Sequence, residues 1–307
     1  MIATFLSDYF DETNCSPKVL EGIRSCLSQT FKLMDLIDIS HSPAIAAVLQ
    51  CAKISVPKKV FQLPKWNLLL VLNHLLDPPY EPICDISFKH LTWKTCFLVS
   101  LATAARCSEI HALSYSGTSH SKNWGSVWLT PNLLFLAKNQ SSYQTLDRRS
   151  YQLHSLQHFA GPDLPERRLC PVRALRLYMA KTEMRRSKQG QRNLFISINP
   201  SRSEEISKSA VSHWLRQLIV EAHTQPSNKS VSISRGTPHE IRAIASSFAF
   251  HHSLGLSDLL QTCTWKSDNV FTSFYLRDVA SQFPTFKGFP PCVVAQRVFH
   301  PPSDKSV

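Results

Sequence analysis

The residues from 237 to 242 read Thr237-Pro238-His239-Glu240-Ile241-Arg242. Thr237 can cap a helix that begins at Pro238, and within that helix His239 and Arg242 lie three positions apart on one face. This arrangement favours a phosphate, because the free backbone N–H groups and the dipole of a helix N-terminus act in the same direction as the two side chains. An exposed histidine and a solvated arginine at a helix start would give the same pattern. The stretch alone therefore leaves a phosphate site and an ordinary helix start as alternatives.

A second stretch reads Ala104-Ala105-Arg106-Cys107-Ser108-Glu109-Ile110-His111-Ala112-Leu113. Arg106 closes a long apolar helical segment, where an unpaired guanidinium would be costly. Glu109 follows one helical turn later, so we expect it to hold a partly buried Arg106 with its planar set of donors turned toward an oxyanion. A purely structural Arg–Glu pair at a helix junction is the alternative.

A third stretch reads Cys263-Thr264-Trp265-Lys266-Ser267-Asp268-Asn269-Val270-Phe271-Thr272-Ser273-Phe274-Tyr275-Leu276. It places Trp265 in a turn, and a short helical segment that follows ends in Tyr275. Taken alone, this stretch is compatible with an ordinary aromatic core.

Taken in this order, the three stretches resemble the catalytic domain of the tyrosine recombinases, the phage-integrase family. The pattern of that family is an arginine, a hairpin lysine, His-x-x-Arg, a histidine or tryptophan, and a tyrosine. The resemblance covers roughly residues 66–278, and the spacing from Arg242 to Trp265 is the usual one. The step from Trp265 to Tyr275 is one residue longer than in typical bacterial members, which implies a small shift in that turn. The resemblance implies a catalytic set of Arg106, Lys138, His239, Arg242, Trp265 and Tyr275, supported by Glu109.

The hairpin lysine is the position with competing candidates. A predicted strand at residues 133–136 ends just before Lys138, which is where the family places its lysine. Lys122 and Arg148 compete for the same role on sequence grounds. We take Lys138 as the expected residue.

Trp265 also belongs to a local sequence that resembles one branch of the family. Its indole N–H would donate to a phosphate oxygen, and its ring would pack the site. The local sequences Pro64-Lys65-Trp66 before a leucine-rich helix and Trp265-Lys266-Ser267 before Phe271 are most similar to the eukaryotic branch carried by DIRS-like and Crypton mobile elements.

The resemblance implies an enzyme that breaks and rejoins DNA strands without a metal or cofactor. Arg106 and Arg242 would neutralise the non-bridging phosphate oxygens while Tyr275 attacks the phosphorus through its phenolic oxygen. The products would be a 3′-phosphotyrosine and a free 5′-hydroxyl, with His239 as the base and Lys138 as the acid for the leaving oxygen. Rejoining to another DNA end would give recombination or integration, and a homotetramer on double-stranded DNA is the expected assembly.

Other functions remain as alternatives at this point. Type IB topoisomerases use a related site, so relaxation of DNA is the nearest enzymatic alternative. A DNA-binding protein that derives from a mobile element and has lost catalysis would keep the same fold and charge. A helical interaction protein with a fortuitous pattern is the third.

The composition favours a polyanionic partner. The 307 residues include 34 Lys and Arg against 22 Asp and Glu, a formal net charge of +12. Nucleic acid is the partner that this excess of basic residues favours. A membrane surface is the rival polyanion, but the sequence has neither a run of about 18 apolar residues nor a strongly basic amphipathic helix, so no membrane association is expected.

Cysteine usage indicates a reducing compartment. The nine cysteines are scattered without a single Cys-x-x-Cys pair, so the sequence predicts neither a disulfide framework nor a zinc site. The first residues run directly into an acidic stretch at residues 7–12 and do not form a secretory signal. We therefore expect an intracellular protein, nuclear if its source is eukaryotic and otherwise cytoplasmic.

The predicted elements indicate an α+β chain that is mostly α-helical and has a small antiparallel sheet. Helices are predicted after Ser16-Pro17 and Ser42-Pro43, and a basic linker broken by proline follows at residues 53–59. The resemblance identifies residues 1–55 as part of a helical, SAM-like core-binding DNA domain. It identifies residues 56–288 as the tyrosine-recombinase catalytic domain, and residues 289–307 are expected to be a flexible tail.

Within the larger domain, hydrophobic periodicity predicts both helices and strands. Helices are predicted near residues 66–72, 87–105, 171–186, 209–222 and 238–252. Strands are predicted at residues 127–129, 133–136 and 151–153.

Overall fold

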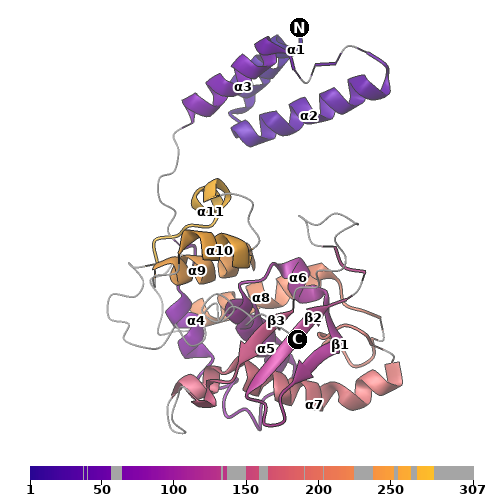
Figure 1. Cartoon of the computed structure of the whole chain (residues 1–307), viewed down its shortest axis with the longest axis vertical. Helices are drawn as coiled ribbons and strands as arrows, with labels where there is room; N and C mark the ends of the chain where they lie inside the picture. Colours follow the sequence, from indigo (N-terminus) through magenta and orange to yellow (C-terminus); the bar gives the residue numbers. More distant parts are fainter. Residues whose placement is uncertain are drawn as a thin grey trace, which may run out of the picture. The chain divides into compact units, whose positions relative to one another are not determined.

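The computed structural model forms two compact units, Met1–Val60 and Phe61–Val307. The division lies between residues 60 and 61, whereas the sequence suggested a boundary after residue 55. The structure describes residues 1–36, 38–39, 41–56, 64–132, 134–136, 150–158, 165–189, 191–202, 204–224, 238–251, 255–263 and 268–279 (Figure 1).

The first unit contains three helices where the sequence suggested two. They are α1 (Ile2–Thr13), α2 (Pro17–Leu33) and α3 (Pro43–Ser55). Helix α2 begins as expected, because the Ser16 side chain accepts a hydrogen bond from the backbone N–H of Val19 and proline occupies the first turn. The three helices bury a small core together, made of Leu6, Leu20, Ile39, Ile45 and Ala52.

Helix α1 was not predicted, and its sequence explains why. It has no capping side chain at its start, so the usual signal for a helix N-terminus is missing. Leu6 is nevertheless fully buried, and the helix ends at Asn14 in the left-handed conformation.

The second unit is built around α5 (Phe88–Thr103), which is buried along almost its whole length. Ser87 caps the helix by accepting from the His90 backbone N–H, and Ala104 ends it in the left-handed conformation. Helix α5 packs against α7 (Pro171–Gln189), α8 (Lys208–His223) and α9 (Pro238–His251). Helix α4 (Leu68–His74) packs on α8. The short α6 (Cys107–His111), α10 (Leu256–Cys263) and α11 (Asp268–Phe274) complete the described helices, with two 3-10 turns at Leu156–His158 and Pro165–Leu169.

A three-stranded antiparallel sheet lies beside these helices, in the order β1 (Leu113–His120), β2 (Ser126–Pro131) and β3 (Tyr151–His154). Val127 pairs with Leu153 and Leu129 with Tyr151, so the buried side chains of β2 and β3 alternate on one face. Helices α5 and α7 both contact β3 (Figure 1). The mostly helical fold with a small antiparallel sheet is therefore confirmed.

One predicted strand is wrong and one strand was missed. Residues 134–136 are not in a strand, because β2 already ends at Pro131. The third strand is instead β1, whose sequence is rich in serine and lacks an apolar alternation because most of it is at least partly exposed. A bulge between Leu113 and Thr118 adds to the irregularity, and there Gly117 allows a close approach to Thr130: a Cβ at residue 117 would lie 2.9 Å from the Thr130 carbonyl oxygen.

In the part of the chain that the structure describes, no helix is long and apolar enough to cross a bilayer.

Candidate active site

Arg106 lies in the tight connection between the core helix α5 and the short helix α6. It directly precedes α6, and the Glu109 carboxylate accepts from the Arg106 backbone N–H at 2.6 Å. The same carboxylate accepts from the Arg106 guanidinium, with Nη1 3.0 Å from Oε1. Both side chains are largely buried, the arginine at 11% exposure. The local pair that the sequence predicted is therefore present, although Arg106 caps α6 and does not close α5.

Arg242 reaches the same carboxylate from α9. Its side chain is 3% exposed, and Nη1 donates to the carbonyl oxygen of Ala104 at 2.8 Å. The same nitrogen lies 3.6 Å from Oε2 of Glu109. The left-handed turn at Ala104 thus turns a carbonyl toward α9 and brings the two arginines to one glutamate. A single carboxylate between two guanidinium groups leaves this cluster with an excess positive charge, which suits an anionic ligand.

Tyr275 follows immediately after α11 and lies beside Arg242. The Cζ atom of Arg242 is 5.7 Å from the centre of the Tyr275 ring, a separation typical of a cation–π contact. The Tyr275 ring is half-buried, and its backbone carbonyl oxygen accepts from the Ser247 hydroxyl at 3.0 Å. Because Ser247 also belongs to α9, this hydrogen bond joins the tyrosine to the helix that carries Arg242.

The other predicted site residues are placed less completely. His239 lies in the first turn of α9 and is exposed, one turn before Arg242. Lys138 and Trp265 lie outside the described residues, as does the competing Arg148. The structure therefore brings together Arg106, Glu109, Arg242 and Tyr275, with His239 on the same helix as Arg242.

Lys122 lies in the connection between β1 and β2, at the far end of β1 from α6. At about 3.3 Å per residue, an eight-residue strand separates the two ends by roughly 20 Å or more. The opposite end of β2 lies next to α6, because the Asn132 backbone N–H donates to the Ala112 carbonyl oxygen at 2.7 Å. The chain that leaves β2 toward Lys138 therefore starts beside α6, whereas Lys122 lies at the other end of the strands.

Two further ionisable residues at this site were not recognised in the sequence. Glu240 and Arg277 are 2% and 5% exposed and form a two-bond ion pair, with Nη2–Oε1 and Nε–Oε2 distances of 2.7 and 3.2 Å. Glu240 follows His239 directly, and Arg277 comes two residues after Tyr275. Their closeness to the two predicted catalytic residues was the available signal. A charged residue inside such a packed segment requires a partner.

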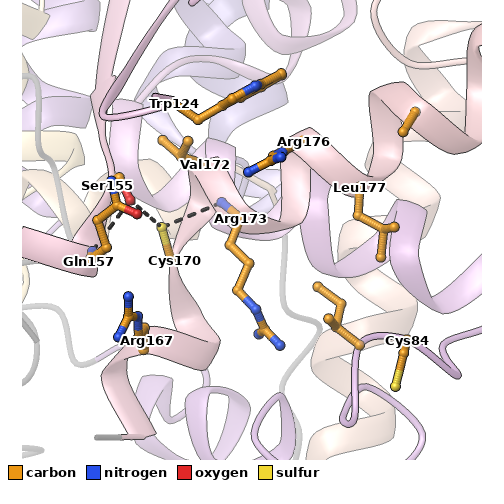
Figure 2. A pocket seen from close by; sticks show the side chains of 12 residues that line it. Cys84, Trp124, Ser155, Gln157, Arg167, Cys170, Val172, Arg173, Arg176 and Leu177 are labelled. Carbon is orange, nitrogen blue, oxygen red and sulfur yellow. Dashed lines mark hydrogen bonds between the residues drawn. The ribbon is translucent and has the colours of Figure 1, made fainter. Parts of the chain in front are cut away.

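A cavity of about 490 Å³ lies elsewhere in the same unit, around the connection between β1 and β2 and the start of α7. Figure 2 shows Trp124, Arg176 and Arg173 on its walls, and the buried thiol of Cys170, which accepts from the Arg173 backbone N–H at 3.4 Å. Arg173 is itself bound to Glu81 through two hydrogen bonds. The residues that line this cavity include none of the arginine cluster, so the cavity is separate from the candidate active site.

No group of three or more His, Cys, Asp and Glu side chains suited to a metal ion occurs among the described residues. The chemical groups at the candidate site are guanidinium, imidazole, carboxylate and phenol groups.

Comparison with known proteins identifies the fold. The solved structure of the XerH site-specific recombinase, bound to a palindromic difH substrate in a post-cleavage complex, matches with a TM-score of 0.53 and 13% identity over 92% of this chain and 70% of that one. A lambda integrase dimer bound to a COC′ core site matches with a TM-score of 0.46 and 15% identity, over 89% of this chain and 63% of that one. XerA recombinase matches with a TM-score of 0.45 and 15% identity, over 92% and 79%.

The XerH match, which has the highest TM-score of these three, carries the assignment. The chain has the fold of a site-specific recombinase, as the sequence predicted. At 13% identity this likeness concerns the fold alone. No family model and no curated protein matches the sequence.

Proposed function

We propose that this protein breaks and rejoins DNA strands as a tyrosine recombinase does, with Tyr275 as the nucleophile. The observation that carries the proposal is the convergence of Arg106 and Arg242 on Glu109, with the Tyr275 ring beside Arg242. These residues come from three separate parts of the chain. A cluster of two arginines next to a tyrosine is what phosphoryl transfer to a phenolic oxygen requires.

The two arginines bind the scissile phosphate in this proposal. A phosphodiester repels nucleophiles through its own charge, and the pentacoordinate transition state carries more charge on the non-bridging oxygens. Arg106 and Arg242 supply fixed donors to those oxygens, and Glu109 holds both guanidinium groups in place so that little reorganisation is needed when the charge develops.

The covalent step forms one bond and breaks another. The Tyr275 oxygen forms a bond to phosphorus while the bond from phosphorus to the 5′-oxygen breaks, and a 3′-phosphotyrosine results. The phenolic proton passes to His239, and Lys138 gives a proton to the leaving 5′-oxygen, while Trp265 donates to a phosphate oxygen. Lys138 is preferred to Lys122 because the chain leading to it starts beside α6. Attack by another 5′-hydroxyl reverses the step and rejoins the strands without an external energy source.

The partner is double-stranded DNA, which the net charge of +12 supports. The matching XerH site-specific recombinase was solved in complex with its difH substrate, which supports the same kind of partner here. We extend the proposal to a homotetramer that exchanges strands, to the DIRS-like and Crypton branch of mobile elements, and to the nucleus as the compartment of such a eukaryotic enzyme. In the same proposal, the three helices of the first unit form part of a core-binding domain.

The experiment is covalent trapping on nicked duplex DNA. The full chain is incubated with a pool of duplexes with a randomised central region and a nick, so that cleavage near the nick releases a short fragment and prevents rejoining. We expect wild type to form a DNA adduct that survives denaturation, and Tyr275→Phe to form none while binding the pool with similar affinity, because only a hydroxyl is lost. Equal trapping by Tyr275→Phe, or DNA binding by wild type without any adduct, would contradict the proposal.

A further inference from the structure

The backbone that follows Tyr275 is bound to α9 by polar contacts that the catalytic scheme does not use. The Ser247 hydroxyl donates to the Tyr275 carbonyl oxygen at 3.0 Å, and the same oxygen atom of Ser247 accepts from the Arg277 backbone N–H at 2.8 Å. Two consecutive contacts to one hydroxyl fix the path of the chain through Tyr275 and Leu276.

The Arg277 side chain adds a second set of contacts around the tyrosine. Its Nη1 donates to the carbonyl oxygens of Phe274 and Leu276, at 3.0 and 3.1 Å, which are the residues before and after Tyr275. Its remaining nitrogens Nε and Nη2 bind both carboxylate oxygens of Glu240. The guanidinium therefore joins the segment of the tyrosine to the residue that follows His239.

We propose that the Glu240–Arg277 pair is a positioning device, which sets Tyr275 against the phosphate site; this rests on the proposed function. Helix α9 carries His239, Glu240, Arg242 and Ser247, so contacts to α9 align the nucleophile with the base and with a phosphate-binding arginine at the same time. A two-bond arginine–carboxylate pair fixes orientation as well as distance.

The helix that precedes Tyr275 is short, so contacts with α9 help to fix its direction. Helix α11 has only seven residues, which is too short to be stable by itself, and Phe274 next to the tyrosine is 52% exposed. Phe271 packs on Phe250 of α9, with ring centres 5.5 Å apart, but an apolar contact without hydrogen bonds does not define the direction of a side chain four residues later. The buried ion pair supplies that direction.

The decisive variant is Arg277→Lys, which keeps the positive charge but loses the planar two-bond geometry. We expect DNA affinity within about 3-fold of wild type and a single-turnover rate of covalent trapping that is lower by about 10- to 100-fold, because a small displacement of a nucleophile has effects of that size. Glu240→Gln removes the negative charge of the partner and should also lower the trapping rate. Arg173→Lys is the matched control, because it changes another two-bond pair, with Glu81, outside the arginine cluster; its trapping rate should equal that of wild type.

A second measurement separates positioning from general damage to the site. Hydrogen peroxide is supplied as an external nucleophile, whose oxygen attacks the phosphorus in place of the tyrosine while the 5′-oxygen leaves. In a Tyr275→Phe background this reaction needs the arginine cluster and not the position of residue 275. We expect peroxide-dependent cleavage to be the same with and without Arg277→Lys, whereas Arg242→Ala should abolish it.

The outcomes distinguish this inference from the proposed function. If wild type traps DNA and Arg277→Lys traps it equally fast, the inference alone is overturned. An equal loss of tyrosine-dependent and peroxide-dependent cleavage in Arg277→Lys would also overturn it, because the variant would then damage the whole site. If wild type forms no adduct on any duplex that it binds, the proposed function fails and the inference fails with it.

Discussion

Glu109 is the residue on which the geometry of the candidate site depends. It binds the backbone and the side chain of Arg106 and lies 3.6 Å from a guanidinium nitrogen of Arg242. Both arginines are largely buried, so the carboxylate also compensates charges that would otherwise be poorly solvated. Its role is thus to make the cluster of two arginines compatible with a folded core.

The prediction at this residue is that Glu109→Ala lowers the free energy of unfolding by about 3 kcal/mol, because two buried guanidinium groups lose a carboxylate that compensates their charge. Urea unfolding followed by circular dichroism measures it. The control is Glu204→Ala, which removes an exposed ion pair with Arg202 and should change the free energy by less than about 0.5 kcal/mol. Similar values for the two variants would show that the cluster does not depend on Glu109.

Local contacts at the site could be predicted from the sequence, and distant ones could not. Arg106 and Glu109 are three positions apart, so helical geometry alone predicts that they meet. Glu240 and Arg277 are 37 positions apart, and no periodicity identifies which of the acidic residues meets Arg277. The pairing depends on how α11 returns to α9, which only the tertiary structure shows.

At the scale of elements, α5 shows how a charge is accommodated in a core helix. Lys94 is fully buried, and its Nζ donates to the Leu75 carbonyl oxygen at 2.9 Å and to Glu81 at 2.5 Å. Arg173 of α7 binds the same glutamate. Burial lowers the pKa of Lys94 from 10.5 to about 8, and the hydrogen bond to Glu81 opposes this only in part.

This lowered pKa predicts how stability changes with pH. Between pH 8 and pH 10.5 the unfolded chain binds a proton at Lys94 that the folded protein has released, so the contribution of this group to the free energy of unfolding increases as the pH rises. Across this range the contribution of Lys94 to the free energy of unfolding changes by about 3 kcal/mol in total. Lys94→Met removes the titrating group. The unfolding free energy of wild type minus that of the variant should therefore rise as the pH increases through this range. Parallel curves for the two proteins would contradict the prediction.

The long apolar helix was predicted well from the sequence, and the short strands of the sheet were predicted less well. Helix α5 was expected at residues 87–105 and spans Phe88–Thr103, because its apolar run and its serine cap are both visible in the sequence. Strand β1 was missed because its residues are mainly polar, and the apolar run at residues 133–136 was mistaken for a strand. Hydrophobic residues indicate which segments are buried. In a small sheet with an exposed edge a strand can be largely exposed, so burial does not show which segments form strands.

For the whole molecule, the net charge of +12 makes a prediction about DNA affinity. If about six phosphates are neutralised, the logarithm of the association constant should fall with the logarithm of salt concentration with a slope of about −5. Fluorescence anisotropy with a labelled duplex at several salt concentrations measures this slope. Affinity that does not change with salt would show that the basic residues do not contact the DNA backbone.

The chemical identity of the nucleophile decides whether this protein acts as a tyrosine recombinase does. Full-length protein is trapped on nicked duplex DNA, the complex is digested with protease and nuclease, and mass spectrometry locates the residue that carries the remaining nucleotide. We expect a nucleotide joined through its 3′-phosphate to Tyr275, the residue beside Arg242. A nucleotide on any other residue, or none at all from protein that binds the duplex, would contradict this expectation.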